Sequence, residues 1–176
     1  MTEYRRYRIA GGTYFFTVVL YDRRTALLTE HIDLLRDAVA EVKRKHPFRI
    51  DAMVVLPEHL HCILTLPVND HDFSMRWRQI KSAFSHGLPV TERLSQSRSV
   101  KRERGIWQRR FWEHVITDQN DFNRHVNYIH FNPVKHRLTE RVADWPYSTF
   151  SKYVERGIYP VTWGGDYIEK LSVAGE

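Results

Sequence analysis

Two β-type runs separated by only two residues constrain the fold most strongly. The runs are 48–56, FRIDAMVVL, and 59–66, HLHCILTL, with Pro57 and Glu58 between them. A crossover to a parallel strand needs about a dozen residues or more, so strands this close in the chain must pair as an antiparallel hairpin. The hairpin therefore predicts a sheet that is at least partly antiparallel.

Further strands and helices alternate around this hairpin. β-branched and aromatic residues predict a strand in 11–23 and another within 106–116. The spacing of apolar residues and the capping residues predict helices in 29–45, 73–88 and 117–136. The order strand, helix, strand, strand, helix, strand, helix predicts an α+β fold, a ferredoxin-like antiparallel sheet with helices packed on both faces.

Composition and charge narrow the class of protein. The chain has 176 residues, of which 42% are hydrophobic, enough for one domain with a core. It contains no apolar run that could span a membrane, and its first residues lead us to expect no signal peptide. The lone Cys62 excludes a disulfide framework and suits a reducing cytoplasm, where we expect the protein to be located. The net charge of +6 favours a polyanionic partner, chiefly nucleic acid.

Basic and aromatic residues are interleaved in residues 98–112, RSVKRERGIWQRRFW. This segment has six basic residues and one acidic residue. Guanidinium groups suit phosphate, and aromatic rings suit unstacked bases. The alternative is a solvated loop followed by a strand whose aromatic residues belong to the core. We expect phosphate contacts from five residues of the whole chain: Lys81, Arg109, Arg110, Lys135 and His136.

The second strand of the hairpin carries a pair of histidines on one face. Because side chains alternate between the faces of a strand, His59 and His61 point the same way. The opposite face is wholly apolar and must be core: Leu60, Cys62, Leu64 and Leu66. Two imidazoles at this spacing can converge on a single cation. The alternative is a pair of solvated histidines at the mouth of the hairpin, because His-x-His alone discriminates poorly.

The third predicted helix places a tyrosine outside its apolar stripe. The stripe consists of Phe122, Val126, Ile129 and Pro133. Tyr128 is off it, and Asn132 follows Tyr128 by one turn on the same face. An amide oxygen is a ligand for hard cations, so the pattern offers a phenol nucleophile beside a third metal ligand. The alternative is a surface tyrosine. Pro133 is expected to end the helix, and it biases Asn132 away from helical geometry. His125 and His130, which flank the tyrosine, are expected to be solvated.

Four segments occur in an order that resembles the IS200-like transposase superfamily, with HUH and tyrosine motifs: PEHLHCIL, WQRRFWEHVI, YIHFNPVKHRL and DWPYSTFSKY. The resemblance runs from Tyr4 to about Tyr153 and is greatest to the REP-associated tyrosine transposases. Its most specific element is the joint occurrence of the histidine pair and the Tyr-x-x-x-Asn-Pro helix end. Many insertion-sequence members carry glutamine where this chain has asparagine, which is the residue of the REP-associated branch.

The resemblance also implies roles for four residues. His59, His61 and Asn132 would hold one divalent cation, Mg²⁺ or Mn²⁺, and Tyr128 would be the nucleophile. The implied function is binding of palindromic repeat (REP-like) hairpins, with cleavage and rejoining of single-stranded DNA through a 5′-phosphotyrosine intermediate.

The same resemblance implies an organisation of the chain. Residues 1–140 would form the transposase domain, and 141–176 an aromatic-rich C-terminal extension packed on it. The branch resembles a monomer acting in cis rather than a dimer. Two other readings stay open at this point. One is a non-catalytic hairpin DNA- or RNA-binding protein on the same fold, and the other is a small metallohydrolase with a water nucleophile.

Overall fold

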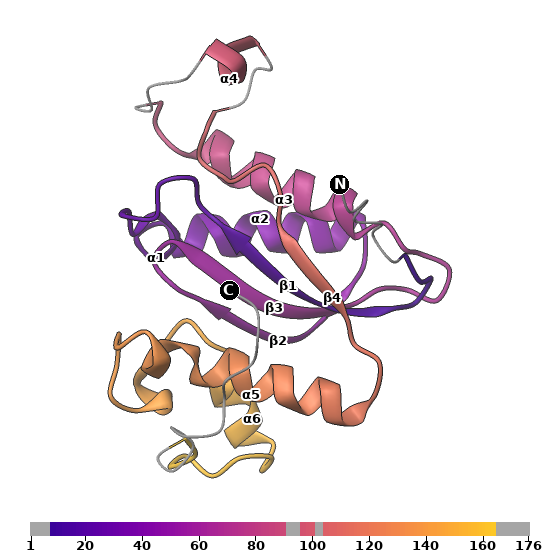
Figure 1. Ribbon diagram of the computed structural model, residues 1–176, viewed down its shortest axis with the longest axis vertical. Coiled ribbons are helices and arrows are strands. Elements are labelled where there is room, and N and C mark those ends of the chain that lie inside the picture. Colours follow the sequence, from indigo (N-terminus) through magenta and orange to yellow (C-terminus); the bar gives the residue numbers. More distant parts are fainter. Residues whose placement is uncertain (1–7, 91–95, 101–103, 165–176) are drawn as a thin grey trace, which may run out of the picture.

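Four antiparallel strands form one sheet with the order β2-β3-β1-β4 (Figure 1). This computed structural model describes residues 8–90, 96–100 and 104–164. The strands are β1 (Thr13–Val19), β2 (Arg49–Val55), β3 (His59–Thr65) and β4 (Trp112–Val115). The chain order and the pairing confirm the predicted ferredoxin-like α+β fold.

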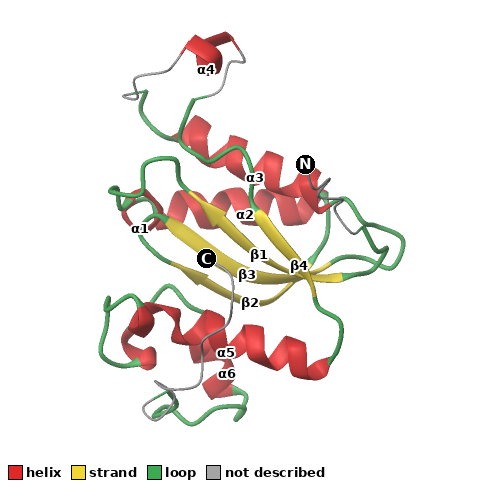
Figure 2. Ribbon diagram, viewed as in Figure 1, coloured by secondary structure: helices red, strands yellow, loops and turns green. Residues whose placement is uncertain are grey.

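Helices cover both faces of this sheet, as the sequence predicted (Figure 2). The helices are α1 (Leu27–Glu30), α2 (Ile32–Lys45), α3 (Phe73–Gly87), α4 (Gln96–Val100), α5 (Gln119–Lys135) and α6 (Phe150–Glu155), with a 3-10 turn at Val142–Asp144. One face carries α2 and α3, which pack side by side, and the other carries α5 and α6. None of the helices in the described part of the chain is long and apolar enough to cross a membrane.

The central strand β3 is buried on both faces. Leu60, Cys62 and Leu64 belong to the core that α2 and α3 cover, whereas Ile63 belongs to the core beneath α5. The predicted division of β3 into an apolar face and a histidine face is therefore confirmed. The histidine face looks toward α5, which makes the α5 side of the sheet the place to search for a site.

The corner between β2 and β3 is held by backbone hydrogen bonds from two other elements. The Leu56 N–H donates to the His59 carbonyl at 2.9 Å. The Glu58 carbonyl accepts from Leu20, just after β1, and the Pro57 carbonyl accepts from Leu28 in α1. Because the corner is fixed in this way, the first histidine of β3 has a defined position.

The helix α5 begins at a capping residue but does not end where the sequence predicted. The Asp118 side chain accepts from the Asp121 N–H at 2.8 Å, which caps the first turn. The expected stop at Pro133 is wrong, because α5 continues to Lys135 and the His136 N–H still donates to the Asn132 carbonyl at 3.0 Å. A proline in the last turn removes only its own hydrogen bond. The buried residues around it hold the turn in helical form.

The segment after α5 returns to the free edge of β2. The Val55 N–H donates to the Tyr147 carbonyl at 2.8 Å, and the Thr149 N–H donates to the Met53 carbonyl at 2.9 Å. This pairing covers part of an edge that would otherwise expose unpaired backbone groups. The start of the family resemblance at Tyr4, part of the basic segment 98–112 and the end of the expected extension 141–176 lie outside the described residues.

Candidate active site

The histidine pair is buried beneath α5. His59 and His61 are each 4% exposed, and their ring centroids are 4.8 Å apart. They are therefore not the solvated histidines that the alternative reading of the sequence required. Two buried imidazoles side by side need polar partners, because burial without them is costly.

One nitrogen of each imidazole has such a partner. Nδ1 of His59 donates to the Glu58 carboxylate at 2.9 Å, and Nδ1 of His61 lies 2.9 Å from the Thr17 hydroxyl. Hydrogen bonds of this kind fix the ring orientation and leave Nε2 as the atom for a metal. Nε2 of His61 is buried and has no hydrogen-bond partner among the described residues.

Burial lowers the pKa of His61 well below its ordinary value, and the positive charges of His59, His136 and Lys135 add to the effect. The ring is therefore neutral at neutral pH. A neutral imidazole is the form that binds a metal ion, since a protonated ring has no lone pair to donate.

Tyr128 lies against the histidine pair from the opposite layer. Its ring centroid is 5.1 Å from that of His61, and the residue is 8% exposed. The Lys135 ammonium lies 5.0 Å from the centre of the same ring. The surface tyrosine of the alternative reading is excluded. The structure brings the phenol and the imidazoles together although 67 positions separate them in the chain (128 − 61 = 67).

Asn132 is fully buried one turn after Tyr128. Neither its amide oxygen nor its amide nitrogen has a hydrogen-bond partner in the described part of the chain. A buried amide without partners destabilises a fold by about 1–3 kcal/mol, so its presence calls for a reason. Amide oxygens and imidazole nitrogens are donor types that suit a divalent cation.

His136 adds a further imidazole at the end of α5. Its ring centroid is 5.2 Å from that of His59. The sequence predicted His136 only as a basic residue that contacts phosphate. The structure instead places it within the cluster of His59, His61 and Tyr128, beside the atoms on which chemistry would occur.

A comparison with known families identifies the family of this chain. Residues 10–132 match the family model described as Transposase IS200 like. The chain belongs to the IS200-like transposase family.

Two relatives and one solved structure resemble this transposase closely. The REP-associated tyrosine transposase of Escherichia coli (strain K12) is 52% identical over 166 residues, which cover 94% of this chain and 93% of the relative. A putative REP-associated tyrosine transposase of Haemophilus influenzae is 45% identical over 94% of this chain and 95% of its own. A solved REP-associated tyrosine transposase bound to a REP hairpin has 50% identity and a TM-score of 0.84, covering 100% of this chain and 98% of that one.

The basic residues expected to contact phosphate lie in two separate places. Lys135 and His136 are at the active-site end of α5, whereas Lys81 lies on α3, across the sheet. Lys81 donates to the Gln108 carbonyl at 3.0 Å and, with Arg109, lines a cavity of about 690 Å³. Other basic residues line the same cavity: Arg78, His86, Arg98 and Arg104.

Arg109 and Arg110 precede the aromatic strand, since β4 begins only at Trp112. Both are exposed and lie in the part of the predicted range 106–116 that precedes the strand. Arg110 does not line the cavity that contains Arg109.

A cluster of His114, Asp121 and His125 was missed by the sequence reasoning. His114 Nε2 donates to the Asp121 carboxylate at 2.8 Å, and His125 Nδ1 donates to the Asp121 carbonyl at 2.9 Å. The expectation that His125 and His130 are solvated is wrong, because they are 7% and 0% exposed. The spacing of Asp121 and His125 by four positions on a predicted helix was the available signal.

The carboxylate at the centre of this cluster stays ionised. Burial raises the pKa of Asp121, but the hydrogen bonds from His114 and Thr117 outweigh burial and lower this pKa to about 2. The three potential ligand atoms of His114, Asp121 and His125 lie within 4.8 Å of one another, so the cluster is a possible metal site. In the structure these atoms are joined by hydrogen bonds, which stabilise the contact between β4 and α5.

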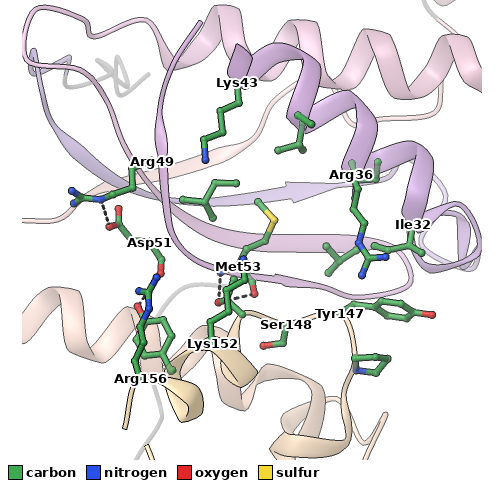
Figure 3. A pocket seen from close by; sticks show the side chains of 18 residues that line it. Ile32, Arg36, Lys43, Arg49, Asp51, Met53, Tyr147, Ser148, Lys152 and Arg156 are labelled. Atoms are coloured by element: carbon green, nitrogen blue, oxygen red, sulfur yellow. Dashed lines mark hydrogen bonds and ion pairs between the residues drawn. The ribbon is translucent and has the colours of Figure 1, made fainter. Parts of the chain in front are cut away.

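A cavity of about 600 Å³ lies apart from the cluster of His59, His61 and Tyr128, at the edge of β2 (Figure 3). Its walls come from α2, β2 and α6, and basic side chains surround it: Arg36, Lys43, Arg49, Lys152 and Arg156. Of these, Arg49 is paired with Asp51 at 2.6 Å. None of the histidines of the site, nor Tyr128, lines this cavity, so it has no part in the cluster described above.

Proposed function

We propose that this chain is a metal-dependent tyrosine transposase that binds REP-like hairpins and cleaves and rejoins single-stranded DNA. The observation that carries the proposal is the contact between the Tyr128 ring and His61, whose centroids are 5.1 Å apart. A phenol beside two buried imidazoles is the arrangement that a tyrosine nucleophile at a metal site requires. The solved relative that is bound to a REP hairpin supports the choice of DNA partner.

The reaction is an exchange of phosphodiester bonds. The Tyr128 oxygen attacks a backbone phosphate, the bond to the 3′ oxygen breaks, and the phenol proton is transferred to the departing 3′-hydroxyl. The phosphate stays on the tyrosine as a 5′-phosphotyrosine. Attack by another 3′-hydroxyl re-forms a phosphodiester and returns the proton to the phenol. Because one phosphate ester replaces another, no nucleotide hydrolysis is needed.

The active-site residues have two roles, to activate the phenol of Tyr128 and to neutralise the charge that the reaction develops. A free phenol is almost fully protonated at neutral pH and needs activation. A divalent cation, Mg²⁺ or Mn²⁺, held by His59, His61 and Asn132 would neutralise charge on the attacked phosphate when bound. Lys135, above the tyrosine ring, contributes a second positive charge near the developing phenolate.

The DNA contacts follow from the basic groups on both faces. Lys135 and His136 would contact the strand at the reacting phosphate. On the far face of the sheet, Lys81 and Arg109 would contact the phosphates of the hairpin, and the exposed Arg110 would add a further phosphate contact. Phosphate contacts of this kind give affinity and register but not sequence recognition.

The organisation of the chain is part of the proposal. The tyrosine helix packs on the sheet of its own chain, which supports a monomer acting in cis. We assign residues 1–140 to the catalytic domain and 141–176 to an extension that, as far as it is described, packs on α5 and β2. A cytoplasmic location suits an enzyme of this kind with a single, buried cysteine.

A covalent adduct tests the proposal. Wild-type protein is incubated with single-stranded REP DNA and Mn²⁺ or Mg²⁺, and the products are separated on a denaturing gel. We expect a protein–DNA adduct that Tyr128→Phe abolishes while hairpin binding persists. Cleavage without an adduct would indicate a metallohydrolase, and binding without any cleavage would indicate a non-catalytic hairpin-binding protein. Either result would overturn the assignment of Tyr128.

A further inference from the structure

Trp112 presents a large aromatic side chain to solvent at the edge of the sheet. It is 44% exposed and lies at the start of β4, an outer strand. Indole rings are usually buried in folded proteins, and they are enriched where a protein binds a partner. The exposure of Trp112 therefore points to a binding partner at this edge of the sheet.

The strand register places Trp112 in the same row as a histidine of the active site. Thr17 of β1 is paired with His61 on one side and with Trp112 on the other. Directly paired residues point to the same face of a sheet, and the contact between the Thr17 hydroxyl and His61 shows that this is the active-site face. Neighbouring strands are about 4.8 Å apart, so the backbones of His61 and Trp112 are separated by about 10 Å.

Phe15 joins the two positions. Its ring centroid is 5.7 Å from Trp112, 5.9 Å from Tyr128 and 5.6 Å from His61. The buried Phe15 thus links the exposed indole to Tyr128 through direct ring contacts. A strand of DNA whose phosphate lies at Tyr128 would bring a neighbouring nucleotide to the exposed indole.

The indole is also backed by a rigid column of rings. Trp112 is nearly parallel to His114, with an interplanar angle of 5°, and His114 is stacked on His125 with a centroid distance of 4.8 Å. Asp121 accepts a hydrogen bond from His114 through its carboxylate and from His125 through its backbone carbonyl. A ring held in this way loses little conformational entropy when another ring stacks on it.

We propose that Trp112 is a stacking platform for one unpaired base of the single-stranded DNA beside the phosphate that Tyr128 attacks. This inference rests on the proposed function, since it assumes that a DNA strand enters the site. Stacked nucleotides are spaced by about 3.4 Å along a strand, so a separation of about 10 Å places this base within about three nucleotides of the phosphate. Stacking accepts any base, so the platform would position the strand without reading its sequence.

The test measures DNA binding, so that it does not depend on cleavage. In a Tyr128→Phe background, dissociation constants are determined for a blunt REP hairpin and for the same hairpin with single-stranded flanks. A series of flanks carries one abasic site at successive positions. We expect Trp112→Ala to weaken binding of the flanked hairpin by about 10- to 100-fold and to leave the blunt hairpin unchanged. Trp112→Phe should recover most of the affinity.

The abasic series distinguishes stacking from a structural role. One abasic position should weaken binding of the Tyr128→Phe protein by the same factor and have no further effect on Trp112→Ala, because both changes remove one interaction. Tyr21→Ala, which removes another exposed aromatic ring, is the matched control and should keep the abasic dependence.

The platform would be overturned if Trp112→Ala weakened the binding of every abasic substrate by the same factor. It would also be overturned if Trp112→Ala weakened the binding of the blunt hairpin. A wild-type adduct without any abasic dependence would overturn the platform alone and leave the transposase proposal standing. Abasic dependence without a wild-type adduct would support the platform and overturn only the catalytic proposal.

Discussion

Replacing Asn132 with leucine should stabilise the metal-free protein and remove its response to metal. The amide of Asn132 is fully buried, and neither of its polar atoms has a hydrogen-bond partner among the described residues. Leucine has a similar volume and no polar atoms. Removing a buried amide that lacks partners should raise the free energy of unfolding by about 2 kcal/mol. For a chain of this length, about 2–4 °C per kcal/mol gives a rise in Tm of about 4–8 °C.

The same substitution should remove stabilisation by the cation. A ligand at about 100 times its Kd stabilises the native state by about 2.7 kcal/mol, so Mn²⁺ should raise the wild-type Tm by about 5–10 °C. Asn132→Leu should lack most of this rise and should form no adduct with DNA. If Asn132 weakens the fold in order to bind a metal, its replacement should raise stability and abolish function together.

Thermal melts in EDTA and in Mn²⁺, followed by circular dichroism, measure both effects. Asn123→Leu is the matched control, because it makes the same change at an exposed position of α5 and should alter stability by no more than about 0.5 kcal/mol. The reasoning is refuted if Asn132→Leu melts below the wild type in EDTA and still shows the full Mn²⁺ response. That result would mean that the amide is satisfied within the fold and holds no cation.

Two further predictions concern residues that act on histidines. Thr17→Val removes the hydroxyl that lies 2.9 Å from Nδ1 of His61, and it should weaken Mn²⁺ binding by about 10-fold in a titration, with adduct formation restored at high Mn²⁺; an unchanged Mn²⁺ affinity would contradict an orienting role. Burial lowers the pKa of His130 from 6.5 to about 3. Protonation of this imidazole therefore favours the unfolded chain. The stability that the neutral ring gives above pH 6.5 is lost as the pH falls toward 3. In urea denaturation between pH 6 and pH 4, His130→Gln should reduce the slope of stability against pH by about 1.4 kcal/mol per unit, and an unaltered slope would show that His130 is not neutral in the fold.

Local periodicity explains which parts of the fold were predictable. The two-residue corner between β2 and β3 leaves no alternative to a hairpin, and the alternation of side chains assigns His59 and His61 to one face. Helical spacing likewise placed Tyr128 and Asn132 on one side of α5. These relations depend only on distances along the chain, which secondary structure fixes.

The failures have a different cause. Whether Pro133 ends a helix depends on the residues packed around it, and here buried neighbours hold the last turn. The burial of His125 and His130 depends on side chains of other elements that cover them, such as Phe15 and Tyr153. Nothing local in the sequence divides the basic residues into groups, but in the structure Lys81 and Lys135 lie on opposite faces of the sheet.

The sequence by itself determined the antiparallel hairpin, the face that carries the histidines and the helix that carries the tyrosine. Only the tertiary structure decided that these two elements meet, that Thr17 orients His61, and that Trp112 stands in the same row of the sheet. The physical reason is that hydrogen bonding and side-chain alternation act between near neighbours in the chain. The contacts of the site instead arise when α5 folds across β2 and β3 to bury a shared apolar surface.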